Sequence, residues 1–359
     1  MISGVDYTRH EVRQMAGYVP GRQPLPGSKV IKLNTNESPF PPSPAVGRAL
    51  SQVLANSDLL RRYPDPQSLE LRRVAAAIFG CDDKQLIAGN GSDELLRILL
   101  DTFVEEGEKV AFFTPSYSLY PVLTRIRGGL AEVLPLFRNG SLYQPRLDDT
   151  KLFFLTSPNA PLGFSFSNDY IRQMANELNG ILVVDEAYAD FAQENALPLL
   201  AEVDNLVVLR TFSKSYGLAS LRVGLGFAAE ALIEQLDKVR DSYNLDRLAQ
   251  VGARAALEDQ DYLRKTVALV VQERQRLAVT LQELGFTVEP SQANFIFVTP
   301  PAGYKAAVLY SGLEKTGILV RYFSDPQLSH GLRITIGTPD EMDQLIVTIK
   351  ELLQNGEIK

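Results

Sequence analysis

Two polar residues that could carry out chemistry follow apolar runs of this sequence. Asp185 comes after the apolar part of ILVVDEAY (181 to 188), and Lys214 closes NLVVLRTFSK (205 to 214). If both runs are parallel strands, their ends point into the crevice where open α/β sheets bind ligands. A carboxylate and an amine in one crevice suit a pyridoxal cofactor. Its aldehyde forms a Schiff base with a lysine, and its pyridine nitrogen needs a carboxylate to stay protonated.

Each of these residues alone has a simpler interpretation. An Asp after an apolar strand is as readily a helix cap, and a lysine in TFSKSYG would usually be a solvated loop residue. The combination favours the cofactor, because Ser213 and Arg222 lie nearby in the sequence. They offer the hydroxyl and the guanidinium that a phosphate group binds.

The segment GNGSDELL (89 to 96) is a second candidate phosphate-binding element. It opens a predicted helix, so the backbone N–H groups of Gly91, Ser92 and Asp93 could bind a phosphate at the positive helix end. Alone, the segment could equally be an ordinary capped helix, because a short glycine-rich match is weak evidence. Tyr117, in PSYSLY (115 to 120), could stack on a cofactor ring or pack at a strand end.

Two arginines near the C-terminus are candidates for binding an anionic substrate. Arg333 lies in GLRITIG (331 to 337), where a guanidinium among apolar neighbours is costly unless it meets an anion. Arg321, in GILVRYF (317 to 323), is the second candidate, with a surface ion pair as its alternative. A carboxylate or phosphate of a small-molecule substrate is the predicted partner.

The elements that must position these residues alternate between strand-like and helix-like segments. The helical segments 92–107 and 167–180 each begin with a capping residue and end with glycine. Such alternation predicts an α/β fold with a mostly parallel central sheet and helices on both faces. The predicted strands are KVAFFTP (109 to 115), KLFFLTSP (151 to 158), ILVVDEAY (181 to 188), NLVVLRTFSK (205 to 214) and VGLGFA (223 to 228).

After about residue 229 the pattern changes to long helical segments, of which 261–285 is the clearest. Three strand-like runs follow, FTVEPSQANFIFVTP, GILVRYF and GLRITIG, separated by helical stretches. We therefore predict a large cofactor-binding domain over 46–260 and a small α+β domain over 261–359. Residues 1–45, rich in Pro, Gly and Asn, are predicted to be an arm that could join the small domain.

The composition favours small-molecule partners. The net charge is −7 and the pI near 5.1, so nucleic acid and anionic membranes would be repelled. The sequence contains no uninterrupted stretch of roughly 18 apolar residues, so we expect no membrane span. The single cysteine, Cys81, excludes an internal disulfide framework, and His10 and His330 are too few for a Cys/His metal cluster. We therefore expect no metal and a reducing, cytoplasmic setting.

These motifs, in this order and spacing, resemble those of the fold-type I, pyridoxal-phosphate-dependent aminotransferases. Within that class the chain is similar to the histidinol-phosphate aminotransferase family. The resemblance runs over almost the whole chain, and a single motif would be weak evidence. The matching segments are NTNESPF (34 to 40), RYPD (62 to 65), GNGSDELL (89 to 96), PSYSLY (115 to 120), SPNAPLG (157 to 163), VVDEAYADF (183 to 191), LRTFSKSYGLASLRVG (209 to 224) and LRITIGT (332 to 338).

The resemblance implies roles for individual residues around pyridoxal 5′-phosphate. Lys214 would hold the cofactor and then move a proton as general acid and base, and Asp185 would pair with the pyridinium nitrogen. Tyr188 would donate its hydroxyl to the ring oxygen, unless it is only a core tyrosine. Asn36 would contact the substrate. Tyr63, in RYPD, would reach the phosphate bound by a neighbouring subunit, which implies a homodimer with shared sites.

One segment departs from the family pattern. The family usually has two successive asparagines and a threonine where this chain has PNAPLG (158 to 163), so that Ala160 and Leu162 replace two polar residues. The second asparagine commonly bonds the ring oxygen. We therefore expect Asn159, Tyr188 or water to supply that contact.

The implied reaction is amino transfer between L-histidinol phosphate and 2-oxoglutarate, giving imidazole acetol phosphate and L-glutamate in histidine biosynthesis. An aromatic amino-acid aminotransferase and a threonine-phosphate decarboxylase could use the same residues. A non-catalytic module is disfavoured because Lys214, Asp185 and Arg222 are all present. A Rossmann dehydrogenase is disfavoured because no complete G-x-G-x-x-G joins a strand to a helix.

Overall fold

A seven-stranded sheet forms the centre of the molecule. The structure, a computed structural model, describes residues 4–25, 27 and 29–354. Its large sheet has the order β2-β10-β9-β8-β7-β3-β4, and all neighbours are parallel except β10, which runs antiparallel to β2 and β9. The strands are β2 (Leu86–Gly89), β3 (Lys109–Thr114), β4 (Leu130–Pro135), β7 (Thr150–Thr156), β8 (Ile181–Asp185), β9 (Leu206–Thr211) and β10 (Gly224–Ala228).

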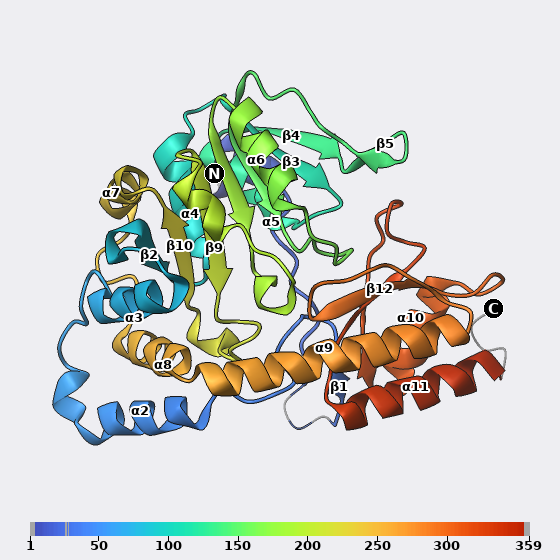
Figure 1. Ribbon diagram of the computed structural model, residues 1–359. Coiled ribbons are helices and arrows are strands. Elements are labelled where there is room, and N and C mark those ends of the chain that lie inside the picture. Colours follow the sequence, from blue (N-terminus) through green and yellow to red (C-terminus); the bar gives the residue numbers. More distant parts are fainter. Residues whose placement is uncertain (1–3, 26, 28, 355–359) are drawn as a thin grey trace.

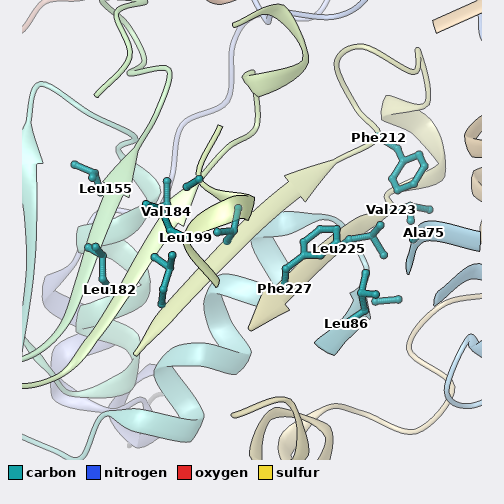
Figure 2. Packing of buried hydrophobic residues seen from close by; sticks show 14 of the residues in the cluster. Ala75, Leu86, Leu155, Leu182, Val184, Leu199, Phe212, Val223, Leu225 and Phe227 are labelled. Atoms are coloured by element: carbon teal, nitrogen blue, oxygen red, sulfur yellow. The ribbon is translucent and has the colours of Figure 1, made fainter. Parts of the chain in front are cut away.

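Helices cover both faces of this sheet, as expected because its central strands are buried on both faces (Figure 1). Successive residues of β8 pack on opposite faces. Leu182 and Val184 join one core with the helices α3 (Leu69–Phe79), α6 (Asn168–Glu177) and α8 (Arg247–Glu258). Figure 2 shows part of this core. Val183 joins the other core, with α4 (Ser92–Phe103), α5 (Leu119–Arg127) and α7 (Glu230–Val239).

The predicted fold class is confirmed, with shifts at the element ends. All five predicted strands of the large sheet are present, but β2 and β4 were not predicted. The helix predicted over 92–107 ends at Phe103, because Val104 is already extended and fully buried in the core. Gly107, with a φ of 83°, lies in the turn that follows instead of capping the helix.

A second, smaller sheet lies beside the first. It is antiparallel and has the order β11-β12-β15-β14, formed by β11 (Thr287–Val288), β12 (Phe295–Thr299), β15 (Leu332–Thr335) and β14 (Arg321–Tyr322). Its apolar core includes residues of α9 (Gln260–Glu283), α10 (Ala306–Lys315) and α11 (Pro339–Gln354). Next to it, β1 (Ile31–Lys32) from the N-terminal arm pairs in parallel with β13 (Ile318–Leu319).

The long helix α9 runs along both parts of the molecule (Figure 1). Its residue Leu263 packs in the core of the large sheet, whereas Val270, Leu277 and Leu281 pack in the core of the small sheet. Because one helix belongs to both cores, the predicted domain limit at residue 261 stays a prediction.

The remaining elements lie at the periphery. The helices are α1 (His10–Gln14) and α2 (Pro44–Ala55), and the strands β5 (Phe137–Arg138) and β6 (Ser141–Leu142) form a hairpin. Among the described residues, no helix is long and apolar enough to cross a membrane.

Candidate active site

The predicted residues meet in a pocket of about 200 Å³. Thr156, Asp185 and Thr211, which end β7, β8 and β9, form one side of the pocket, and Arg321 and Arg333 from the small sheet form the other. Eleven of the residues named from the sequence line it: Asn36, Ser92, Asp93, Tyr117, Asp185, Tyr188, Ser213, Lys214, Arg222, Arg321 and Arg333.

Asp185 is a buried carboxylate whose partners are both uncharged. One oxygen accepts a hydrogen bond from the Tyr120 hydroxyl at 2.9 Å, and the other accepts from the Ala187 backbone N–H at 3.2 Å. Burial raises the pKa of Asp185 to about 6, although both hydrogen bonds act in the opposite direction. Among the described residues, no basic side chain lies within 4 Å of this carboxylate. A cationic group in the pocket would therefore be stabilised here.

The Lys214 amine lies on the same pocket and donates to the Thr35 carbonyl oxygen at 3.1 Å. Burial, with a smaller contribution from the Arg333 charge, lowers the pKa of Lys214 to about 8. An amine with this pKa is partly neutral near pH 7, and the neutral form is the nucleophile and the base.

The N-terminus of α4 and Arg222 form a small cup of hydrogen-bond donors. Ser213 Oγ accepts from Arg222 Nη1 at 3.2 Å, and Asp93 Oδ2 lies 3.1 Å from Nη2. Gly91 has a φ of 79°, which favours glycine, and a Cβ there would lie 2.6 Å from Arg222 Nη2, so the guanidinium would have to move away. Helix N–H groups, a hydroxyl and a guanidinium are the donors that a phosphate requires, so the residues fit the phosphate of the predicted cofactor.

Tyr117 lies between this cup and the strand ends. Its hydroxyl donates to Asp93 Oδ1 at 3.1 Å, and its ring makes edge contacts with Tyr18 and Tyr120, with centroids 5.8 and 5.6 Å apart. Burial and the negative charge of Asp93 raise the pKa of Tyr117, so the phenol stays protonated. The ring is thereby fixed at the wall of the pocket.

Tyr188 and Asn36 are joined across the pocket. The Tyr188 hydroxyl accepts from Asn36 Nδ2 at 2.9 Å. Asn36 is in turn fixed by Thr335, because its N–H donates to Thr335 Oγ1 at 3.1 Å and its Oδ1 accepts from the same hydroxyl at 3.0 Å. Burial raises the pKa of Tyr188, which keeps its proton available for donation.

Arg333 is not fully satisfied. Its Nη2 donates to the Asn34 carbonyl oxygen at 2.9 Å, but its buried Nε has no hydrogen-bond partner among the described residues. The guanidinium lies over the rings of Phe295 and Phe323, at 5.3 and 5.6 Å from their centroids. Burial lowers the pKa of Arg333, with a smaller effect from the nearby Arg321 charge. An anion would remove this deficit.

Arg321 also faces Phe323, with its guanidinium carbon 5.3 Å from the ring centroid. The surface ion pair considered from the sequence is not formed with any described residue within 4 Å. Two arginines at one end of the pocket therefore share no acidic partner there.

Three predicted residues, Gly91, Asn159 and Tyr63, are not among those that line the pocket. Asn159 faces the backbone of its own loop: its Nδ2 donates to the Pro115 carbonyl oxygen at 3.2 Å and its Oδ1 accepts from the Leu162 N–H at 3.3 Å. Tyr63 is 76% exposed and stacks on Tyr243 with a centroid separation of 4.4 Å, away from the pocket of its own chain.

Several residues at the site were missed in the sequence. Tyr120, which bonds Asp185, stands three residues after Tyr117 at the start of α5, and this helical spacing was a usable signal. Tyr18 also lines the pocket, and the Thr35 carbonyl oxygen accepts from Lys214. Tyr18 and Thr35 both lie in the irregular N-terminal arm, and a contact made by a backbone carbonyl cannot be predicted from the identity of the residue.

Comparisons with known proteins agree with this site. Residues 28–349 match the family described as aminotransferase class I and II. The histidinol-phosphate aminotransferase of Geotalea daltonii is 48% identical over 345 residues, covering 96% of this chain and 99% of that protein.

Two solved structures have the same fold. The histidinol-phosphate aminotransferase of Sinorhizobium meliloti in complex with pyridoxal-5′-phosphate has a TM-score of 0.85 and 26% identity, covering 98% of this chain and 99% of that one. The L-threonine-O-3-phosphate decarboxylase of Porphyromonas gingivalis has a TM-score of 0.78 and 22% identity, covering 90% and 100%. The second likeness concerns the fold alone, so the fold does not separate the two reactions.

Proposed function

The chain belongs to the class I and II aminotransferases, and from this premise we infer that it transfers the amino group of L-histidinol phosphate to 2-oxoglutarate. The products are imidazole acetol phosphate and L-glutamate. The observation that carries the inference is one pocket with the Lys214 amine, the buried Asp185 carboxylate and the incompletely bonded Arg333 guanidinium. Close relatives named histidinol-phosphate aminotransferase, at 46 to 48% identity, support this substrate pair.

The cofactor is pyridoxal 5′-phosphate. When bound, it supplies an electron sink that stabilises negative charge at the substrate Cα. We propose that the N–H groups of Gly91, Ser92 and Asp93, with Ser213 and Arg222, hold its phosphate, while Tyr117 flanks its ring. The cup around Gly91 supports this assignment, because a side chain there would collide with the guanidinium.

We propose that Lys214 has two tasks, to hold the cofactor and to move a proton at the substrate Cα. A pKa lowered to about 8 supports both, because the neutral amine is present at physiological pH. The hydrogen bond to the Thr35 carbonyl oxygen keeps Nζ on the pocket while no ligand competes for it.

We propose that Asp185 holds a proton on the cofactor's ring nitrogen and that Tyr188 donates to its ring oxygen. The burial that raises the pKa of Asp185 to about 6 disfavours an unpaired anion, so a cationic partner would return this pKa to a lower value. With Ala160 in the pocket wall and Asn159 engaged elsewhere, Tyr188 is the remaining predicted side-chain donor to the ring oxygen.

We propose that Arg333 and Arg321 bind the anionic groups of the substrates, with Asn36 beside them. Histidinol phosphate brings a phosphate and glutamate brings two carboxylates, so both substrates suit a pair of arginines. Displacement of the Asn34 carbonyl oxygen by such an anion would replace a neutral acceptor with a charged one.

The test is a set of single half-reactions with the purified holoenzyme. The absorption spectrum of the bound cofactor is followed while histidinol phosphate, glutamate, phenylalanine, tyrosine or threonine phosphate is added. We expect rapid conversion to the amine form with histidinol phosphate and glutamate, and much slower conversion with the aromatic amino acids. A preference for phenylalanine or tyrosine would replace the substrate assignment, and carbon dioxide released from threonine phosphate would indicate a decarboxylase.

We further propose a homodimer whose sites are shared through Tyr63. The exposed Tyr63 lies in a surface hollow with Arg62 and Arg247, outside its own pocket, and is available to a second subunit. A Tyr63 variant and a Lys214 variant, each inactive, should restore partial activity after joint unfolding and refolding, because one heterodimer site is intact. Subunits that exchange without restoring any activity would place each site within a single chain.

We also propose a cytoplasmic location. It is supported by Cys81, which is a free thiol, and by the metabolic nature of both substrates. Fractionation of cells that express the tagged chain would test it, and recovery outside the cytoplasm would contradict it.

A further inference from the structure

Two buried charged residues, Arg210 and Glu186, and the partly buried Asp190 form a cluster outside the residues that line the pocket. Arg210, on β9, is 8% exposed and lies between two carboxylates. Its Nη1 donates to Asp190 Oδ1 at 3.0 Å, whereas its Nε forms an ion pair with Glu186 Oε2 at 2.9 Å without the geometry of a hydrogen bond. Glu186 is 3% exposed and also accepts from the Ala196 N–H at 2.5 Å. None of these residues lines the pocket.

This ionic network contacts the loop that carries Asp185 and the loop that carries Lys214. Glu186 immediately follows Asp185, and its backbone N–H donates to the Leu209 carbonyl oxygen at 2.9 Å. Asp190 accepts a short hydrogen bond from the hydroxyl of Ser215, which immediately follows Lys214. A continuous chain of contacts therefore joins the neighbour of Asp185 to the neighbour of Lys214.

The network is a poor source of stability. Removing charges from water costs free energy that their attraction only partly offsets, and well-packed apolar residues often serve as well. What the buried Arg210 does supply is position, because its guanidinium donates a directed hydrogen bond to Asp190 and holds the Glu186 carboxylate beside it by charge. The geometry it fixes here is that of two loops that leave adjacent parallel strands, β8 and β9.

We propose that Arg210 is a positioning residue for amino transfer: through Glu186 and Asp190 it sets the placement of Asp185 relative to Lys214. The inference rests on the proposed function of these two residues. Asp185 faces the pocket and Glu186 contacts Arg210 behind it, as expected for successive residues at a strand end. A shift of Glu186 would move Asp185 with it.

The first test replaces the guanidinium by an apolar side chain of similar length, Arg210→Met. The matched control is Arg72→Met, because Arg72 is 7% exposed, lies 3.3 Å from Asp237 Oδ2 and does not line the pocket. We expect both variants to lose thermal stability. Arg210→Met should also lose on the order of 100-fold in kcat with KM for glutamate nearly unchanged, since small misplacements of reacting groups have effects of this size.

A second, less disruptive pair of variants tests the proposal even if Arg210→Met does not fold. Ser215→Ala removes the link to the Lys214 loop without unpairing a buried charge. Ser43→Ala removes a similar, partly buried serine–aspartate hydrogen bond, to Asp259, and neither residue lines the pocket. We expect Ser215→Ala to lower kcat roughly fivefold, the effect of one hydrogen bond, and Ser43→Ala to leave kcat unchanged.

A spectroscopic readout separates positioning from stability. The absorption of the cofactor bound at Lys214 is titrated with pH, without substrate. We expect its midpoint to shift in Arg210→Met and Ser215→Ala but not in the two controls. Unchanged midpoints, with kcat reduced no more than in the controls, would overturn the proposal. This titration does not depend on histidinol phosphate, so it distinguishes failure of the positioning role from failure of the substrate assignment.

Discussion

The cofactor side and the substrate side of the pocket are held in different ways. On the cofactor side, each oxygen of Asp185 has a donor, from Tyr120 and from Ala187, and both donors belong to the large-sheet domain. On the substrate side, Arg333 donates to the Asn34 carbonyl oxygen of the N-terminal arm, and its Nε has no hydrogen-bond partner among the described residues.

This difference indicates that the hydrogen bonds on the cofactor side are already complete before a substrate binds, whereas those on the substrate side are not. The Asp185 carboxylate accepts from a side chain of α5 and from a backbone N–H just after β8, so it is pre-organised for one partner. A guanidinium that is bonded to a neutral carbonyl can exchange it for a stronger, charged acceptor. We therefore expect changes on the cofactor side to affect kcat and changes on the substrate side to affect kcat/KM.

The largest effect is expected for Lys214→Ala. Without the amine, neither attachment of the cofactor nor proton transfer is possible, so activity should fall on the order of 10⁵-fold or more. Borohydride reduction and peptide mapping of the wild-type holoenzyme should place the cofactor on Lys214. As a control, Lys238→Ala changes a lysine of α7 that bonds Gln235 and does not line the pocket, so this variant should retain activity. A label on another lysine would remove Lys214 from this role.

Asp185→Asn should have the next largest effect. The amide keeps the shape and accepts from Ala187, but it cannot hold a proton on the ring nitrogen. We expect kcat to fall on the order of 100-fold or more while the cofactor remains bound. Steady-state kinetics and the spectrum of the dialysed variant measure the two quantities, and near-wild-type turnover would contradict the role of Asp185.

Arg333→Ala should reduce activity less than Asp185→Asn, and the loss should appear in kcat/KM and not in kcat alone. Losing one partner of a buried charged contact typically costs about 2 to 5 kcal/mol, which is roughly 30-fold or more in kcat/KM. Glutamate and histidinol phosphate should both be impaired, with cofactor binding intact. If kcat alone falls and KM is unchanged, the contrast between the two sides of the pocket is wrong.

The smallest effect concerns the stability of the cofactor-free protein. Burial raises the pKa of Asp185 to about 6, so the folded state binds this proton more tightly than the unfolded state. Stability contributed by the protonated form is therefore lost as pH rises from about 4 to 6, at up to about 1 kcal/mol per pH unit. Denaturant unfolding should show this slope in the wild type, reduced in Asp185→Asn and unchanged in the exposed Asp148→Asn.

The sequence was sufficient for the sheet and for the residues at strand ends. Long apolar runs specify buried parallel strands, and Asp185 and Lys214 follow two of them, so their convergence could be predicted. The short strand β2 and the exposed edge strand β4 were missed. The four residues of β2 are too few for a periodic signal, and β4 is partly exposed on its open side.

Contacts made by backbone atoms or by irregular segments could not be predicted. The carbonyl oxygens of Asn34 and Thr35 have no residue-type signal, yet they bond Arg333 and Lys214. Asn159 shows the converse problem. Its residue type suits a ligand contact, but the fold of its own loop directs the amide to the backbone of Pro115 and Leu162, which residue type does not reveal.

The parallel pairing of β1 with β13 has a consequence for biosynthesis. Ile31 lies opposite Ile318, so β1 is synthesised early but can pair only after β13, near the other end of the sequence, has been synthesised. At about 5 to 20 residues per second, the ribosome needs on the order of tens of seconds to produce the intervening chain. The next residues after β1 supply the carbonyl groups for Arg333 and Lys214. Nascent chains should therefore complete the large sheet before the catalytic centre, which matures only after translation is nearly finished.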